Sequence, residues 1–177
     1  MVSDLQSNAV YQIDIPEGFI VDSGAKSYTG TAYTFATTEQ SGLLHGWGDN
    51  DQGQVGDNTV VLRSSPVQIP SKNWIQISAD THYSADHSGG LKANGTLWAW
   101  GKNQYGQLGQ GSANGSISSP VQIPGNWSAF ACGVYSMAAV NTDGELFTWG
   151  YNSSGQLGQN DGSSAHRSSP VQVPGTT

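Results

Sequence analysis

Short alternations of apolar and polar residues, separated by turn-forming dipeptides, recur along the chain. Residues 96–100 and 145–149 alternate in the way that half-buried strands do. An Asn-Gly pair at 94–95 and an Asp-Gly pair at 143–144 come directly before them and are typical of hairpin turns. Nowhere do apolar residues keep a helical spacing for more than two turns. The pattern therefore predicts an all-β protein with many short strands.

The alternating strands belong to a repeat that occurs three times. A Trp-Gly pair recurs at spacings of 53 and 49 residues, each time followed by x-Asn-x-x-Gly-Gln and then Leu or Val and Gly. Chance would not place three such composite matches at a common period, so the repeat is the main organising feature of the chain. The recurring residues that we expect to be structural are Trp47, Gly48, Asn50, Trp100, Gly101, Asn103, Trp149, Gly150 and Asn152.

Each copy continues with a Ser-Ser-Pro-Val-Gln segment, which begins at Ser64, Ser118 and Ser168. Its proline predicts an extended piece at a sheet edge, where a missing N–H is tolerated. A further strand is predicted over residues 127–130, and another over residues 136–140, whose small side chains suit a crowded inner position. The unit is then four short strands in about fifty residues, which is the size of a β-propeller blade.

The loop after Trp-Gly has a predicted role for each of its recurring residues. Its glycines supply positive φ angles and allow a close approach of neighbouring backbone. The Asn side chain is expected to cap the turn by hydrogen-bonding nearby backbone. The Leu or Val is expected to be the single apolar anchor beneath the loop.

The Trp-Gly motif, with Ser-Pro-Val-Gln after it and Asn/Asp-Gly ahead of it, resembles the regulator-of-chromosome-condensation repeat. The resemblance covers residues 43–177 and implies a β-propeller, which in that family usually has seven blades. The variant at residues 118–127, Ser-Ser-Pro-Val-Gln-Ile-Pro-Gly-Asn-Trp, looks most like repeats in virion proteins of marine bacteriophages. The chain departs from the pattern at residues 80–86, an insertion with Asp80 where a glycine is expected.

The repeat divides the chain into five predicted parts. Residues 1–18 lie outside it and form either an extra strand on the first blade or an arm that docks on a larger particle. An ungapped alignment places Tyr33 on Tyr135. The other parts are half a blade at 19–42, repeat 1 at 43–95, repeat 2 at 96–144, and half a blade at 145–177.

About three blade equivalents are too few to close a ring, because known propellers have about four or more. One alternative is a head-to-tail homo-oligomer, in which each C-terminal half-blade completes the N-terminal half of its neighbour. The other is that the chain is part of a larger propeller. The mass in solution distinguishes the two.

Composition and charge exclude several classes of function. The formal net charge is -7 and no basic stripe occurs, which opposes nucleic-acid binding. No apolar run is long enough to cross a membrane, and no signal-peptide pattern begins the chain. The single cysteine, Cys132, excludes an intrachain disulfide and is expected to be a small buried residue.

Candidate catalytic, cofactor and metal residues are not found. Residues 49–53 briefly resemble a calcium loop, but its glycine is fifth instead of sixth and its twelfth residue is Val60. His45 stands where the other copies have Trp98 and Phe147, so packing explains it, and His166 lies isolated in a loop. No nucleophile elbow or carboxylate pair suggests a hydrolase. We expect a protein that is not an enzyme and needs no cofactor.

Binding is the more plausible activity, because propeller loops form exposed faces and aromatic side chains are good anchors. Tyr105 and Tyr151 occupy variable positions after Trp-Gly, and His82, Tyr83 and Asp86 lie in the insertion. The alternative is that these side chains only cover their own blades.

The resemblance favours a non-enzymatic virion protein: a tail-fibre, knob or capsid-decoration component, with virion proteins or a host-surface receptor as partners. It would then be located in the virion. The alternative is a soluble propeller that binds and inhibits or regulates a partner enzyme, or a guanine-nucleotide exchange factor. No nucleic-acid partner and no membrane insertion are expected.

Overall fold

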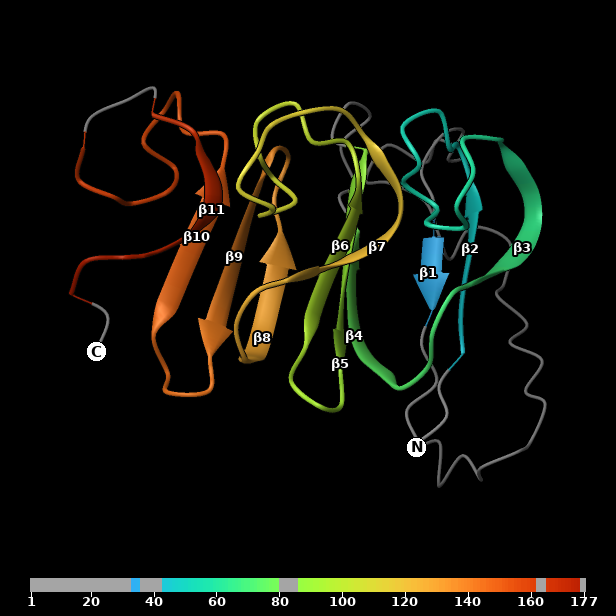
Figure 1. The fold of residues 1–177 in the computed structure, drawn as a ribbon, viewed down its shortest axis with the longest axis horizontal. Helices are drawn as coiled ribbons and strands as arrows, with labels where there is room; N and C mark the ends of the chain where they lie inside the picture. Colours follow the sequence, from blue (N-terminus) through green and yellow to red (C-terminus); the bar gives the residue numbers. More distant parts are fainter. Residues whose placement is uncertain (1–32, 36–42, 80–85, 162–164, 176–177) are drawn as a thin grey trace, which may run out of the picture.

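Three antiparallel β-sheets stand side by side in the computed structural model (Figure 1). The structure describes residues 33–35, 43–79, 86–161 and 165–175. The N-terminal sheet has the order β1-β2-β3, the central sheet β4-β5-β6-β7, and the C-terminal sheet β8-β9-β10-β11. The all-β propeller architecture predicted from the sequence is confirmed, with four-stranded blades in the two complete sheets.

The strands are three to seven residues long. Their bounds are β1 Tyr33–Phe35, β2 Leu44–Gly48, β3 Arg63–Ile69, β4 Trp74–Ala79, β5 His87–Lys92, β6 Leu97–Gly101, β7 Ile117–Ile123, β8 Trp127–Cys132, β9 Ser136–Asn141, β10 Leu146–Gly150 and β11 Arg167–Gln172.

Each Ser-Ser-Pro-Val-Gln segment lies in a strand at the edge of its sheet. β3, β7 and β11 pair on one side only, with β2, β6 and β10 respectively. An edge strand tolerates the missing N–H of Pro66, Pro120 and Pro170, as predicted. The small-residue strand β9, in contrast, lies between β8 and β10 within its sheet.

The sheets are out of phase with the sequence repeat. The central sheet takes β4 and β5 from the end of one repeat and β6 and β7 from the beginning of the next. The C-terminal half-repeat, residues 145–177, supplies β10 and β11 to the complete sheet that β8 and β9 begin. A neighbour therefore need not complete this half-blade, and the predicted strand exchange at that end is wrong.

The ungapped alignment of the N-terminal half-repeat is wrong by two residues. Tyr33 pairs with Trp47, whereas Met137 pairs with Trp149, so Tyr33 occupies the position of Met137 instead of Tyr135. Tyr33 and its partner Trp47 are thus two residues further apart in the sequence than Met137 and its partner Trp149. Residues 1–18, predicted to form an extra strand or a docking arm, lie outside the described residues.

The hydrophobic core lies between the sheets. One cluster joins Leu91, Leu97 and Ile123 of the central sheet to Trp127 and Trp149 of the C-terminal sheet. A second cluster joins Leu44 and Ile69 of the N-terminal sheet to Trp74 and Trp100 of the central sheet. Each sheet therefore buries a face against its neighbour, which is how propeller blades are held together.

The recurring asparagines hold the loops after β2, β6 and β10 in one conformation. Asn50, Asn103 and Asn152 are buried, and the Oδ1 atom of each accepts the N–H of the apolar anchor five residues later, at 2.9–3.0 Å. These anchors, Val55, Leu108 and Leu157, are at most 2% exposed. The capping and anchoring roles predicted for the loop are confirmed.

Two joints connect the three sheets, and both are built from the repeat motif. At the first, the indole N–H of Trp100 donates to the carbonyl of Gln54 at 2.9 Å, and at the second Trp149 donates to Gln107 at 2.9 Å. The donor comes from one sheet and the acceptor from the loop of the sheet before it. The Trp and Gln of the repeat thus bind each other across neighbouring copies.

Glycine permits each joint to close. A Cβ atom on Gly106 would lie 2.5 Å from the Cα of Ser168 in the next sheet, and one on Gly53 would lie 2.5 Å from the Cα of Ser118. Both glycines have a positive φ, 79° and 78°. Only a residue without a side chain allows the loop to pack against the outer strand of the next sheet at this distance.

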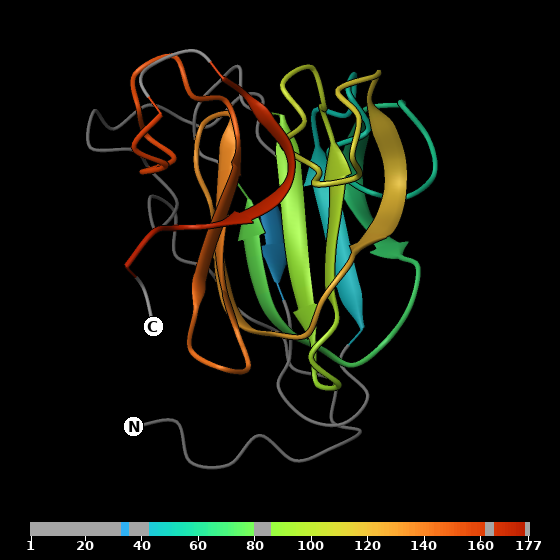
Figure 2. The same cartoon turned by 60° about the vertical axis from the view of Figure 1, so that its left-hand side comes forward.

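The loops that carry these joints all lie at one end of the sheets, which we call the loop face (Figures 1 and 2). No helix long and apolar enough to cross a membrane occurs in the described part of the chain. Cys132, predicted to be buried, is only half-buried at the end of β8, and its Sγ lies 3.3 Å from the carbonyl of Ser78.

Candidate binding surface on the loop face

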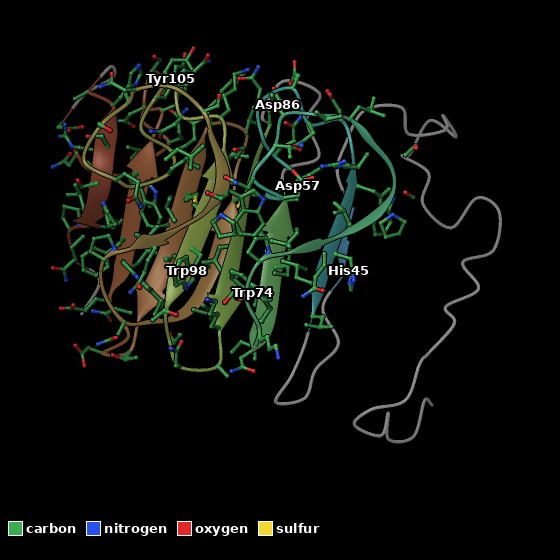
Figure 3. All side chains as sticks on the ribbon, turned by 45° about the vertical axis from the view of Figure 1, so that its right-hand side comes forward. His45, Asp57, Trp74, Asp86, Trp98 and Tyr105 are labelled. Atoms are coloured by element: carbon green, nitrogen blue, oxygen red, sulfur yellow. The ribbon has the colours of Figure 1, made fainter. Side chains whose placement is uncertain are left out.

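Four aromatic side chains from different segments meet on the loop face. Tyr105 comes from the central sheet, and Tyr135, Tyr151 and His166 come from the C-terminal sheet. Tyr105 lies at the centre, with its ring centroid 5.2 Å from Tyr135, 4.7 Å from Tyr151 and 5.1 Å from His166. We call this group the aromatic cluster. Figure 3 shows Tyr105 at the same end of the molecule as Asp86.

The aromatic cluster is held in place by backbone contacts. The Nδ1 atom of His166 accepts the N–H of Asn152 at 3.1 Å, and its ring stacks on Tyr151 at 4.9 Å. The amide of Tyr105 donates to the side chain of Gln107, a buried residue of the second joint. Its three tyrosines are half-buried and His166 is exposed, so the cluster is rigid at its base and accessible at its surface.

An ion pair continues the surface toward the N-terminal sheet. Lys102 Nζ lies 3.2 Å from Asp86 Oδ2 and 6.0 Å from the ring of Tyr135. The backbone carbonyls of Asp86 and Tyr135 play the same part: the first accepts the N–H of Lys102, and the second that of Tyr151. The central sheet thus places a Lys–Asp pair where the C-terminal sheet places two tyrosines.

Negative charge gathers at the end of the surface opposite to the aromatic cluster. Burial raises the pKa of Asp86, the Lys102 ammonium opposes that shift, and Asp51 and Asp49 of the N-terminal sheet raise the pKa further. Three carboxylates therefore lie close enough to interact. The loop face changes from acidic over the N-terminal sheet to aromatic over the C-terminal sheet.

Comparison with known proteins identifies the repeat. The model of the regulator of chromosome condensation (RCC1) repeat matches residues 41–85, 94–140 and 143–177, which is most of the chain. The chain belongs to the RCC1 repeat family. A second RCC1 repeat model matches residues 74–107 and 127–156.

The curated relatives are much longer proteins, and the chain matches only a small part of each. The chain is 36% identical over 100 residues to the RCC2 homolog of Danio rerio and 32% identical over 100 residues to human RCC2, matches that cover 55% of this chain. It is 36% identical over 81 residues to the human E3 ubiquitin-protein ligase HERC2, 46% of this chain. The matched regions are 20%, 19% and 2% of those relatives.

Two solved structures share the fold of this chain. Human WBSCR16 aligns with a TM-score of 0.64 at 24% identity, over 84% of this chain and 39% of that chain. Prp20p of Saccharomyces cerevisiae aligns with a TM-score of 0.68 at 18% identity, over 78% of this chain and 37% of that chain. At these identities the likeness shows the fold alone.

Two of the predicted binding residues meet in this RCC1 surface. Tyr105 and Tyr151 are neighbours in the aromatic cluster, and Asp86 lies beside Lys102 on the same face. His82 and Tyr83 lie outside the described residues.

Tyr135 was not predicted from the sequence to be a binding residue, and His166 is not isolated in its loop. His166, expected to be isolated, contacts both Tyr105 and Tyr151. Its partner Tyr105 belongs to the preceding RCC1 repeat, so a comparison of aligned positions does not bring the two together. Pairing each loop with the outer strand of the next repeat would have found this contact.

A cavity of about 530 Å³ lies between the outer parts of the central and C-terminal sheets. Apolar surface from Trp127, Phe147 and Pro170 lines it, and Asp143 is its only ionisable residue. Among the described residues no group of three His, Cys, Asp or Glu side chains could hold a metal ion. The cavity offers no pair of acid and base groups, so the loop face is the better candidate site.

Proposed function

We propose that this chain is a protein-binding module and not an enzyme, and that it binds its partner through the loop face. The observation that carries this proposal is the aromatic cluster, which two sheets assemble from four rings. Half-buried, preorganised tyrosines anchor protein partners well, because little side-chain entropy is lost on binding.

The charge of the face selects the chemistry of the partner. Asp49, Asp51 and Asp86 attract a basic side chain, and the tyrosine faces stack on an arginine guanidinium. The net charge of -7 attracts a basic partner during encounter as well. We therefore propose a partner segment that carries arginine or lysine beside an apolar or aromatic residue.

The family membership supports a protein partner. Prp20p has been described with its binding to Gsp1p and histones, and yeast RCC1 has been solved with Kap60 bound. These partners belong to those proteins, but they show that propellers of this fold bind proteins. Guanine-nucleotide exchange needs a protein surface of the same kind and stays a prediction.

The virion role has no support in these comparisons, which favour the alternative of a soluble protein-binding propeller. Virion location, a host-surface receptor and a virion partner all stay predictions.

Selection from a displayed library of random peptides tests the proposed function. We expect enrichment of arginine- and lysine-containing peptides, and binding that weakens as salt is added. Tyr105→Ala should weaken the selected peptides at least about tenfold, because it removes the ring at the centre of the cluster. Affinity is measured by fluorescence anisotropy.

Two matched variants complete this test. Ile75→Ala removes an exposed apolar side chain on β4, at the end of the central sheet away from the loop face, and should leave binding unchanged. Asp51→Asn should weaken binding more than Asp143→Asn, which changes an exposed aspartate in the β9–β10 turn. Peptides that bind equally to wild type and Tyr105→Ala would disprove this site.

A further inference from the structure

The loop after β10 has the sequence of a joint acceptor, but among the described residues no sheet packs against it. Its residues Gly155, Gln156 and Gly158 correspond to Gly106, Gln107 and Gly109 of the second joint. The corresponding residues at both formed joints are buried, Gln54 at 4% and Gln107 at 0%, whereas Gln156 is exposed. We call the loop 151–158 the open socket.

None of the described residues fills the hollow of the open socket. A Cβ atom on Gly155 would have nothing within 4 Å, whereas one on Gly53 or Gly106 would collide with the serine of the next sheet. Leu157 nevertheless donates its N–H to Asn152 at 3.0 Å, as in the formed joints. The socket therefore keeps the conformation of a formed joint without the partner.

The N-terminal sheet, at the other end of the molecule, carries the type of edge-strand segment that packs into such a loop at the formed joints. In the formed joints the carbonyls of Ser118 and Ser168 accept backbone N–H groups of the preceding loop, at 2.8 and 2.7 Å. Ser64 has the same position in β3 and is exposed, whereas Ser118 and Ser168 are half-buried. We call residues 62–66 the plug.

The residue two positions before this serine also contacts the preceding loop at each formed joint. Ser116 donates to the side chain of Gln52 at 2.8 Å, and His166 contacts Tyr105. The corresponding residue of the N-terminal sheet is Leu62, which is 63% exposed beside the exposed Val60 and Val61. An apolar side chain thus stands in water where the other two copies bind the preceding loop.

From these observations we propose that the open socket of one copy binds the plug of a second copy, head to tail. The occupant is a second copy because the socket is filled twice within the chain by residues of this type, and the chain itself carries a third set. The two sheets meet face to face, and the C-terminal sheet already has four strands in its own chain, so it donates no strand to its neighbour. The contact is heterologous and produces a ring or a longer assembly. The contact does not rest on the proposed binding function of the loop face, although the open socket and the aromatic cluster share Tyr151.

Mass in solution provides the first test. Light scattering should give a multiple of 18.6 kDa for the wild type. Gly155→Leu should reduce the mass to that of one chain, because the side chain fills the socket. Gly144→Leu is the matched control: φ is +86° there and +73° at Gly155, and both sites have open space, so the strain is alike and only the place differs.

A directional cross-link provides the second test. In a Cys132→Ser background, Ser154→Cys lies at the socket and Leu62→Cys at the plug, at the positions that meet as Gln52 and Ser116 in the first joint. A short bismaleimide should link the two single variants when they are mixed, and neither variant alone. A wild-type mass of 18.6 kDa, an unchanged mass in Gly155→Leu, or equal linking of each variant alone would overturn the proposal.

Discussion

At the scale of residues, a buried indole N–H and a backbone carbonyl connect one sheet to the next. The Gln54 carbonyl accepts both the Trp100 indole and the Ser88 hydroxyl, at 2.9 Å each. The sequence allowed the loop conformation to be predicted, since Asn, Gly and Leu act within one copy. It did not allow the Trp–Gln contact to be predicted, because the partners belong to different copies and their offset depends on how the sheets pack.

Replacing each of the two buried tryptophans of the C-terminal sheet by phenylalanine distinguishes the contribution of the indole hydrogen bond to stability from that of the buried ring. Trp149→Phe removes the donor to Gln107, whereas Trp127→Phe removes an indole N–H that has no acceptor among the described residues. Both changes remove similar ring area. We expect Trp149→Phe to cost about 1–2 kcal/mol more free energy of unfolding, because it leaves a buried carbonyl without its donor. Urea unfolding measures both; equal costs would show that the joint hydrogen bond contributes nothing.

At the scale of elements, a charged clasp holds the loop between β2 and β3. Asp57 Oδ1 accepts the amide of Thr59 at 3.0 Å and its hydroxyl at 2.6 Å, and Oδ2 binds Arg63 Nε. Burial raises the pKa of Asp57, but the hydrogen bonds from Thr59 and Arg63 outweigh it and the net pKa is lowered. Asp161 and Arg167 form the same pair in the last copy. The clasp fixes the loop that ends in the plug.

The clasp makes this loop sensitive to acid. A lowered folded-state pKa stabilises the protein above the ordinary aspartate range, and that stability is lost as pH falls through the folded-state pKa. Asp57→Asn should therefore lower the free energy of unfolding by about 1–3 kcal/mol at neutral pH. Its difference from wild type should shrink below about pH 4.

Thermal unfolding across pH measures this difference. Asp143→Asn, an exposed turn aspartate, is the control and should follow the wild type throughout. A constant gap between Asp57→Asn and wild type at all pH values would exclude the clasp as its cause.

At the scale of the molecule, the three sheets form an arc in which each sheet packs against the sheet next to it. The fold class and the edge position of Pro66, Pro120 and Pro170 could be predicted, because periodicity and proline chemistry act locally. The offset between the sheets and the sequence repeats could not be predicted, because each complete sheet takes its strands from two repeats. The position of β1 was missed because its residues lie two positions further from their β2 partners than those of β9 do from β10, and an ungapped alignment cannot detect that.

This arrangement predicts a gradient of hydrogen-exchange protection. The central sheet has a joint on each side, and every residue of β5 is buried. The N-terminal sheet has one joint within the chain and three described strands. Exchange followed by mass spectrometry should therefore be slowest in β5 and β6 and faster in β2 and β3, because structure packed only against a nearest neighbour opens at its ends first. Uniform protection of the three sheets would contradict this.

The joint also constrains how the gene can change. Each acceptor loop and the strand that packs against it belong to successive repeats. A substitution in one repeat must therefore remain compatible with the residues of the next repeat that it contacts. If one entire repeat is gained or lost, every remaining acceptor loop still packs against an edge strand with the same Ser-Ser-Pro-Val-Gln motif. The length of the arc can therefore vary in steps of one repeat, here 53 or 49 residues, without a new interface having to arise.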